Sequence, residues 1–320
     1  MSSTNYKNKE SIVLESDRIR AELLPNPGGK LASLIDKSTG YEFFVQRPDP
    51  IYKEQPFDAL YVEAECSGFD DMFPTIDECF YESFPWKGTK LADHGELWSL
   101  PWKATFDSEN SDIPSVEFST GGVRFPYSIK KRVQLINPET LHYQYELLNH
   151  SAFDFEYLWA GHMMINLQEG TKIVLPEDCK EATSVLSAGS SKFGDVHQWP
   201  FLKDATGNPY RADIARNASV KGFEKLYFTK PLDQGFCKLE YPDGNRIEVQ
   251  FETKNVPYLG ILINEDGWDG LYNIIIEPCS ICYDRPDVAK KYGQVCVLPG
   301  FSSIQWAMNI KVGDCIEKKQ

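Results

Sequence analysis

Short runs in which apolar and polar residues alternate recur along the whole chain, and turn-forming residues separate them. Alternation with a period of two is typical of a strand that buries one face. Pro, Gly, Asn and Asp bound the runs, as expected where strands give way to turns. The runs that predict strands are residues 11–14, 18–24, 128–136, 141–148, 238–241, 246–251, 258–264, 272–277, 294–298 and 303–312.

Turn chemistry predicts one hairpin and one helix. Asp243 and Gly244 lie between two predicted strands and supply the positive φ values that a tight turn needs, so residues 238–251 predict a hairpin. Residues 286–292 begin with proline and are followed by Gly293, an arrangement typical of a short helix. Helical patterns are otherwise scarce, so we expect few helices.

Two long segments do not follow the strand pattern. Residues 50–105 are rich in proline, glycine and aromatic residues, and residues 186–215 are polar and irregular. Long irregular loops within a compact domain usually carry functional residues. No linker or internal repeat divides the chain, and strands do not alternate with helices. We therefore expect residues 1–320 to form a single all-β domain, a large sandwich of antiparallel sheets with few short helices.

Composition narrows the possible partners and location. The chain has 320 residues, of which 42% are hydrophobic, enough for a large buried core. The formal net charge of -14 disfavours binding to nucleic acid or to an anionic membrane. The sequence shows no apolar signal-peptide stretch and no apolar run that could span a membrane. We expect a cytoplasmic protein, a monomer or homodimer, without nucleic-acid or membrane partners.

The cysteines do not suggest a disulfide scaffold or a metal site. There are 8, at irregular spacing in a long chain. Cys279 and Cys282 have the spacing of a zinc-binding pair, but no second pair and no histidine pair completes a site. We expect no metal.

Glu277 is a candidate for acid–base chemistry. It ends an apolar run, residues 272–276, and precedes Pro278, which holds the preceding residue extended. A carboxylate at the tip of a buried strand needs a partner or a raised pKa. Two interpretations are open: a salt-bridged glutamate at a strand end, or a general base.

His162 lies within the apolar run of residues 157–165, directly after Gly161. A glycine there is expected to give a ligand room to approach. The histidine is either a satisfied core residue or a general acid, for which the usual imidazole pKa near neutrality is suited.

The segment of residues 93–102 combines His94 with two carboxylates, including Glu96, and two tryptophans. Sugar sites use this mixture, because aromatic faces contact the C–H face of a pyranose while polar groups bind its hydroxyls. The alternative is a structural loop held in place by its aromatic residues.

Further polar candidates lie in two other loops. Asp70 and Asp71 are part of an acidic and aromatic segment, residues 67–77, which lacks the spacing of a calcium-binding loop. They suit either a polar ligand or a turn held by side-chain hydrogen bonds. Asn264 begins a polar loop, residues 264–268, whose amide and acidic groups suit the hydroxyls of a diol.

These motifs, taken in order, resemble those of the aldose 1-epimerase (galactose mutarotase-like) superfamily. The resemblance covers roughly residues 11–313, and its strength comes from the order and spacing of several moderately specific motifs. The segments that carry it are the Gly-Gly turn of residues 25–34, the His-Gly and Pro-Trp motifs of residues 93–102, Trp159 to His162 followed by residues 173–176, Ile276 to Pro278, and residues 298–306.

The resemblance implies a β-supersandwich fold and a role for each matching residue. Glu277 matches the general base that takes a proton from the anomeric hydroxyl, and His162 matches the general acid that protonates the ring oxygen. His94 matches a second histidine that binds the sugar. Proton transfer alone suffices, so no cofactor is expected. The other candidates for sugar contacts are Asp70, Asp71, Glu96, Trp159 and Asn264.

One departure concerns the substrate. Where family members acting on free hexoses usually carry an Asn-Arg pair, this chain has the acidic segment of residues 68–73. The missing cation argues against a phosphorylated sugar. We expect an isomerase that interconverts α and β anomers of a free monosaccharide or sugar derivative. The main alternative is a non-catalytic carbohydrate-binding or sensor protein on the same fold; a lyase or hydrolase is a third reading, without the residue pairing it would need.

Overall fold

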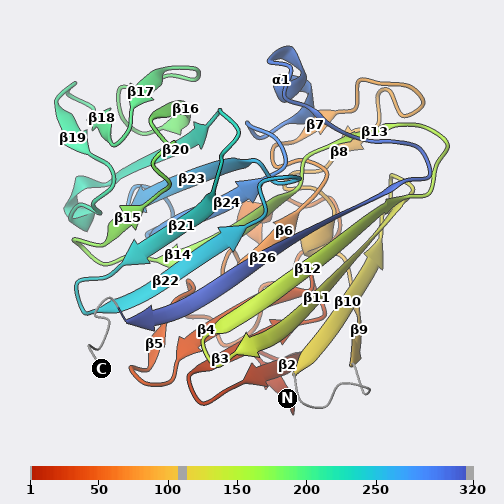
Figure 1. Cartoon of the computed structure of the whole chain (residues 1–320), viewed down its shortest axis with the longest axis horizontal. Helices are drawn as coiled ribbons and strands as arrows, with labels where there is room; N and C mark the ends of the chain where they lie inside the picture. Colours follow the sequence, from red (N-terminus) through yellow and green to blue (C-terminus); the bar gives the residue numbers. More distant parts are fainter. Residues whose placement is uncertain (1, 107–113, 315–320) are drawn as a thin grey trace.

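The computed structural model describes residues 2–106 and 114–314, and its regular structure is dominated by two antiparallel sheets (Figure 1). The larger sheet has 12 strands. In order of pairing they are β1 (Ser2–Tyr6), β2 (Lys9–Glu15), β3 (Ile19–Leu24), β4 (Lys30–Asp36), β6 (Phe69–Met72), β14 (Ala160–Asn166), β24 (Tyr272–Cys279), β23 (Tyr258–Glu265), β20 (Gly222–Phe228), β16 (Glu181–Ser187) and β17 (Val196–Gln198), with β5 (Tyr41–Glu42) paired to β4.

The smaller sheet has 8 strands, several of which run side by side across the molecule in Figure 1. In order they are β15 (Lys172–Val174), β21 (Gly235–Glu240), β22 (Asn245–Phe251), β26 (Ser303–Asp314), β12 (Thr140–Asn149), β11 (Tyr127–Asn137), β10 (Ser115–Gly121) and β9 (Lys103–Phe106).

Short elements complete the described structure. Three two-stranded sheets pair β13 (Phe155–Tyr157) with β25 (Cys296–Leu298), β18 (Phe201–Lys203) with β19 (Pro209–Arg211), and β7 (Cys79–Phe80) with β8 (Lys90–Leu91). The α-helix is α1 (Pro286–Lys291), and the 3-10 helices are η1 (Tyr61–Glu63), η2 (Leu97–Ser99) and η3 (Ala218–Val220).

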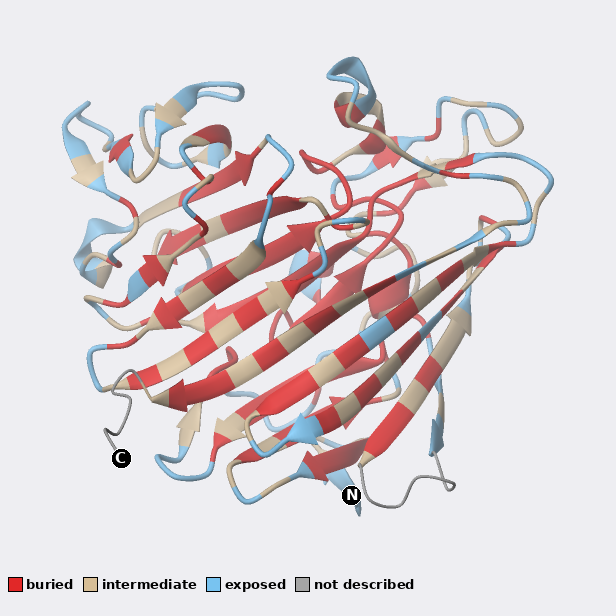
Figure 2. Ribbon diagram, viewed as in Figure 1, coloured by how far each residue is buried: buried red, intermediate tan, exposed pale blue. Residues whose placement is uncertain are grey.

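Strand alternation produces the main core. Along β11, β12 and β22, inward residues are buried while their neighbours are partly exposed, which gives the banded strands of Figure 2. Their inward residues, such as Ile129 and Leu147, join one apolar cluster with Leu23 and Ile165 of the larger sheet. Each such side chain contributes about 1.5–3 kcal/mol when fully buried. This shared core holds the two sheets face to face.

The central strands of the larger sheet are buried on both faces. Every residue of β14 except the last is buried, and so is every residue of β24 except the first. Their second face contacts a separate apolar cluster that includes Tyr61, Ile76, Tyr283 and Ala289, from η1, loops and α1. Polar side chains on this second face are therefore removed from water.

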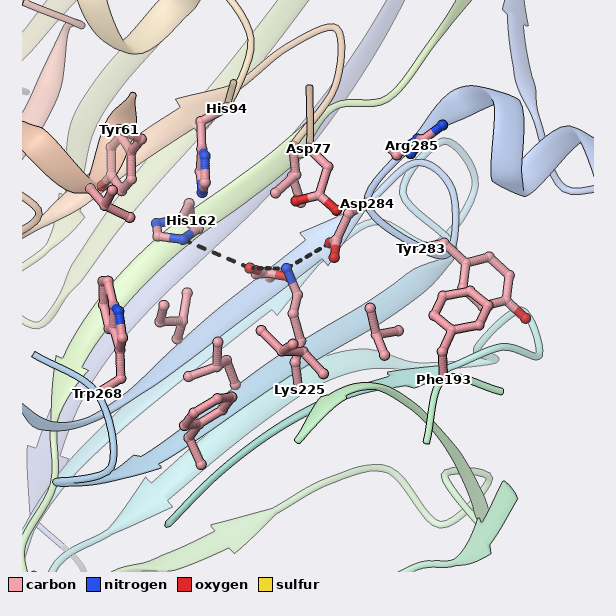
Figure 3. Close-up of a pocket in the computed structure, with 18 of the residues that line it drawn as sticks. Tyr61, Asp77, His94, His162, Phe193, Lys225, Trp268, Tyr283, Asp284 and Arg285 are labelled. Carbon is pink, nitrogen blue, oxygen red and sulfur yellow. Dashed lines mark ion pairs between the residues drawn. The ribbon is translucent and has the colours of Figure 1, made fainter. Parts of the chain in front are cut away.

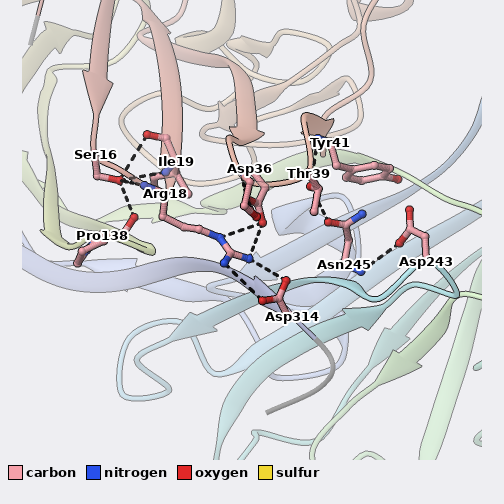
Figure 4. Close-up of polar contacts among 11 residues, drawn as sticks. Ser16, Arg18, Ile19, Asp36, Thr39, Tyr41, Pro138, Asp243, Asn245 and Asp314 are labelled. Atoms are coloured by element: carbon pink, nitrogen blue, oxygen red, sulfur yellow. Dashed lines mark hydrogen bonds and ion pairs between the residues drawn. The ribbon is translucent and has the colours of Figure 1, made fainter. Parts of the chain in front are cut away.

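Ion pairs and hydrogen bonds join the sheets at one end (Figure 4). The Arg18 guanidinium, just before β3, lies 2.7 Å from Asp36 of β4 and 2.9 Å from Asp314 of β26. The Thr39 hydroxyl donates to Asn245 Oδ1 of β22 at 2.9 Å. Because Asp36 is fully buried, salt screens its ion pair with Arg18 less than it screens an ion pair on the surface.

The all-β, antiparallel sandwich expected from the sequence is confirmed. The ten predicted strands all fall on observed strands, β21 and β22 form the predicted hairpin, and α1 occupies the predicted helix. The segments of residues 50–105 and 186–215 are less irregular than expected, since they contain short strands β6 to β9 and β17 to β19. Most of these short strands pair with distant segments or within small hairpins, which alternation does not reveal.

Within residues 2–106 and 114–314, no helix has both the length and the apolar character required to cross a membrane. The seven cysteines in these ranges are free thiols.

Candidate active site

A cavity of about 440 Å³ opens on the face of the larger sheet that points away from the smaller sheet. Its floor comes from five neighbouring strands, β14, β24, β23, β20 and β16. Residues two apart on a strand point the same way. His162 and Met164 therefore face the cavity together, as do Ile275 and Glu277. Loops and the helical segments η1 and α1 form the walls.

Glu277 is fully buried on this floor. Its carboxylate faces nitrogen atoms of Lys225 and His162, two residues that Figure 3 labels in the cavity. Its Oε1 lies 3.2 Å from Lys225 Nζ and 3.8 Å from His162 Nε2. Neither contact has hydrogen-bond geometry, so Oε1 retains the capacity to accept a proton or a hydrogen bond. Burial raises the pKa of Glu277; Lys225 opposes this rise and Asp284 adds to it.

Lys225 connects two carboxylates. Its Nζ lies 2.6 Å from Asp284 Oδ1, and the Tyr227 hydroxyl donates to the same oxygen at 2.7 Å and to Glu277 Oε2 at 3.4 Å. Burial lowers the pKa of Lys225, but Asp284 and Glu277 outweigh it and raise the pKa above its usual value. Lys225 is therefore a buried cation at neutral pH. Burial and the neighbouring Asp284 also raise the pKa of Asp77, at the edge of the same cavity.

A glycine makes room for this cluster. Gly260 of β23 pairs with Glu277 on one side and with Tyr227 on the other. A Cβ atom at Gly260 would lie 2.8 Å from Glu277 Oε2 and 2.9 Å from the Tyr227 ring. Both distances are below normal contact, so only glycine lets the two side chains meet across β23.

His162 is almost fully buried beside Glu277, and its Nδ1 has no hydrogen-bond partner among the described residues. Burial, with contributions from His94, Lys225 and Lys30, lowers the pKa of His162 well below 6.5. The expectation that this imidazole titrates near neutrality is therefore wrong, because it assumed a solvated environment. His162 is neutral at pH 7.

Gly161 does not give a ligand access to the cavity, as the sequence suggested. The nearest atoms to a Cβ at this position belong to Met163, Phe69 and Trp159, at 3.3, 3.4 and 3.5 Å. Alternation along β14 turns Gly161 toward the core between the sheets while its neighbour His162 faces the cavity.

His94 lies on the opposite wall from the sheet, in a loop where its own φ is 57°. Its ring stacks on Tyr61 with centroids 4.5 Å apart and meets the His162 ring edge-on at 5.5 Å. Its Nδ1 lies 3.1 Å from Asp93 Oδ1, without hydrogen-bond geometry. The structure thus brings His94, His162 and Glu277, the three principal candidates of the sequence, to one cavity.

Three other sequence candidates lie outside the cavity lining. Asp70 forms a buried ion pair with Lys30 at 2.7 Å and is covered by Tyr61, whose hydroxyl donates to it. Asp71 pairs with a buried lysine of the smaller sheet, Lys131, at 2.5 Å. Trp159 donates its indole N–H to the same carboxylate at 3.1 Å. Adjacent residues of a strand face opposite sides, so the two aspartates serve different layers of the fold.

Glu96 and Asn264 also make protein contacts rather than line the cavity. The Glu96 carboxylate accepts hydrogen bonds from the Arg124 backbone N–H at 2.9 Å and from the Tyr127 hydroxyl at 2.9 Å. Asn264 donates to the Trp268 carbonyl at 2.9 Å and accepts from the Trp268 N–H at 3.0 Å. Asn264 thereby fixes the loop that places the Trp268 indole against the cavity.

No sequence motif singled out Lys225, Asp284 or Tyr61, whereas Asp77 ends the acidic segment of residues 67–77 that was a candidate for a polar ligand. The available signal for Lys225 was a charged residue in the otherwise apolar run of residues 225–228. Tyr61 lies in η1 and Asp284 in a loop, and neither is part of a recognisable sequence motif. Within the described ranges, no group of three His, Cys, Asp or Glu side chains is arranged to hold a metal ion.

Solved structures with the same fold span nearly the whole chain. The Slr1438 protein from Synechocystis sp. PCC 6803 has a TM-score of 0.72 and 18% identity, covering 98% of this chain and 100% of that one. A galactose mutarotase-like protein from Lactobacillus casei ATCC 334 has a TM-score of 0.66 and 17% identity, covering 95% and 100%.

A galactose mutarotase related enzyme from Lactobacillus acidophilus has a TM-score of 0.64 and 14% identity, covering 96% of this chain and 98% of that one. No protein-family model matches the sequence, and a search of curated proteins finds no match. The structural similarity confirms the architecture that the sequence motifs suggested: the chain has the galactose mutarotase-like fold.

Proposed function

We propose that this protein is an aldose 1-epimerase-like isomerase that interconverts the α and β anomers of an unphosphorylated sugar. The observation that carries the proposal is the meeting of Glu277 and His162 on neighbouring strands. A carboxylate oxygen with free acceptor capacity lies 3.8 Å from an imidazole nitrogen, and both side chains line one cavity. The fold similarity supports the same reading.

Anomer interconversion requires two coupled proton transfers. Glu277 takes the proton from the anomeric O1 hydroxyl as the C1–O5 bond breaks, and O5 receives a proton from His162. The product is the open-chain aldehyde. Rotation about C1–C2 exposes the other face of the aldehyde, and the same two groups then reverse their transfers during ring closure. Protons and electrons balance over the cycle, and both residues return to their starting state.

The charge cluster suits these roles. Lys225 stabilises the ionised form of Glu277 and so keeps it available as a base despite burial. A neutral His162 still serves as the acid: its N–H hydrogen-bonds to O5 and transfers its proton as O5 develops alkoxide charge. The imidazolate that remains regains this proton from the O5 hydroxyl during ring closure. The site has more acidic than basic groups, with Asp77, Asp284 and Glu277 around Lys225. This balance disfavours a phosphorylated sugar.

Polarimetry of freshly dissolved α-D-glucose and α-D-galactose, within a wider sugar panel, tests the proposal. The Glu277→Gln variant keeps the side-chain shape but removes the base, so kcat is expected to fall by about 10²–10⁴-fold. The matched control is Glu181→Gln, a change at the rim of the larger sheet outside the cavity lining, which should leave the rate unchanged. Calorimetry separates the alternative: wild-type protein that binds sugars without accelerating mutarotation is a non-catalytic carbohydrate binder.

A further inference from the structure

The cavity is more apolar than a free monosaccharide needs. Beyond the polar cluster, its lining includes the large apolar side chains of Val62, Leu186, Phe193, Phe223, Trp268 and Tyr283. A pyranose presents hydroxyls around its edge and can place one C–H face on an aromatic ring such as Trp268. The remaining apolar surface then has no sugar group to cover it.

Three of these side chains are exposed to solvent at the mouth of the cavity. Val62 is 49% exposed, Leu186 54% and Phe193 53%. They come from three separate places, η1, the end of β16 and the loop that follows it, yet they line one opening. Apolar side chains gathered at an opening from distant segments mark a surface that a ligand covers.

Three aromatic residues, Phe193, Tyr283 and Tyr292, form a ledge that extends this surface on the side away from Trp268, where Figure 3 shows Phe193 and Tyr283. The Phe193 ring lies 5.8 Å from the Tyr283 ring, which stacks on Tyr292 at 4.8 Å. Tyr283 has a φ of 70°, in the left-handed region that bulky residues rarely adopt. The surrounding structure therefore holds an aromatic side chain at this position against its backbone preference.

The cations near the ledge already have partners. The Arg285 guanidinium lies 2.7 Å from Asp287, and Lys225 Nζ lies 2.6 Å from Asp284. An anionic substituent on the sugar would meet paired cations and additional carboxylates. The group that covers the apolar surface is therefore uncharged.

We propose that the ligand of this site is a neutral reducing sugar that carries an apolar substituent, an alkyl or acyl group, on a carbon other than C1. This proposal rests on the function proposed above, since Glu277 requires a free O1 hydroxyl and the substituent must therefore lie elsewhere on the ring. The sugar ring contacts the polar cluster, and the substituent covers Leu186, Phe193 and Tyr283.

Calorimetric binding of D-glucose, D-galactose and their 3-O-, 4-O- and 6-O-butyl ethers tests this proposal, because stable ethers add an apolar group without charge. At least one ether is expected to bind at least about 10-fold more tightly than its parent sugar, since small apolar groups in an apolar pocket change affinity by about 10–200-fold. If no ether binds more tightly than its parent, the proposal is overturned.

Two phenylalanine variants assign the effect to the ledge. Phe193→Ser should weaken binding of the ether more than binding of the parent sugar, so that the advantage of the ether is lost. Phe201→Ser is the matched control, because Phe201 is 55% exposed but lies on β18, outside the cavity lining. The proposal would be overturned if both variants lost ether affinity equally. It would also be overturned if Phe193→Ser abolished self-association of the protein but left ether binding unaffected.

Binding and turnover are measured separately, so failure of one proposal does not hide the other. Phe193-dependent binding of an ether without accelerated mutarotation supports the ligand class and contradicts the isomerase. Mutarotation of free sugars with no preference for any ether supports the isomerase and contradicts the ligand class.

Discussion

Replacing Gly260 with alanine is a direct test of whether the Glu277 carboxylate is held in a reactive position. The new Cβ would lie 2.8 Å from Glu277 Oε2 and 2.9 Å from the Tyr227 ring. The tyrosine is fixed by its 2.7 Å hydrogen bond to Asp284, so the carboxylate is the group that moves. Its contacts with Lys225 and His162, at 3.2 and 3.8 Å, change with it.

The expected magnitudes differ for stability and for rate. Inserting a methyl group into a packed site costs about 1–3 kcal/mol. Reduced freedom of the unfolded chain offsets about 0.4–1 kcal/mol of this cost. Gly260→Ala is therefore expected to destabilise the protein modestly, by about 0.5–2 kcal/mol. A carboxylate misplaced by about 1 Å can lower the rate by about 10²-fold, so kcat should fall far more than stability.

Urea denaturation and polarimetric mutarotation measure the two effects on the same samples. Gly121→Ala is the control, because a Cβ there meets only the Tyr127 carbonyl oxygen, at an ordinary 3.4 Å. It should be neutral or slightly stabilising and leave the rate unchanged. A folded Gly260→Ala protein with a rate within about twofold of wild type would refute the reasoning that rate depends on this carboxylate's position.

Three further results are expected. Because burial raises the pKa of Glu277 and its ionised form is the base, kcat/KM should be highest above that pKa and decline as pH falls through it; a flat acid profile would contradict this. Lys225→Met should move this decline to higher pH, since Lys225 lowers the pKa of Glu277, while the exposed Lys230→Met control should not. Asp70→Asn should leave Lys30 buried without its partner and lower the free energy of unfolding by about 3–5 kcal/mol. A loss below about 1 kcal/mol in urea denaturation would show that this pair is relaxed or hydrated.

Strand alternation and turn residues, which involve residues close in the chain, predicted much of the fold. The alternation in residues 128–136 and 141–148 corresponds to β11 and β12, which pair over nearly their whole length. The Asp-Gly turn and the proline-to-glycine segment gave the β21–β22 hairpin and α1. These features depend on residues close in the chain, whose turn chemistry and side-chain period act over a few positions.

The candidate site was predictable only in part. Glu277 and His162 were recognised as unusual polar residues in apolar strands, and pairing of β14 with β24 brings them together. Asp70 and Asp71 look equivalent in the sequence, but they face opposite sides of β6 and pair with different buried lysines. Sequence spacing did not indicate which carboxylates the fold would neutralise.

The sequence by itself determined that the chain forms antiparallel sheets and that two polar residues interrupt apolar strands. Only the tertiary structure decided that Lys225 lies beside Glu277, that His162 has a pKa well below its usual value, and that an apolar opening adjoins the polar cluster. The physical reason is the distance along the chain over which each interaction acts. Strand periodicity is set by neighbouring residues, whereas ion pairing and desolvation depend on which distant segments cover a side chain.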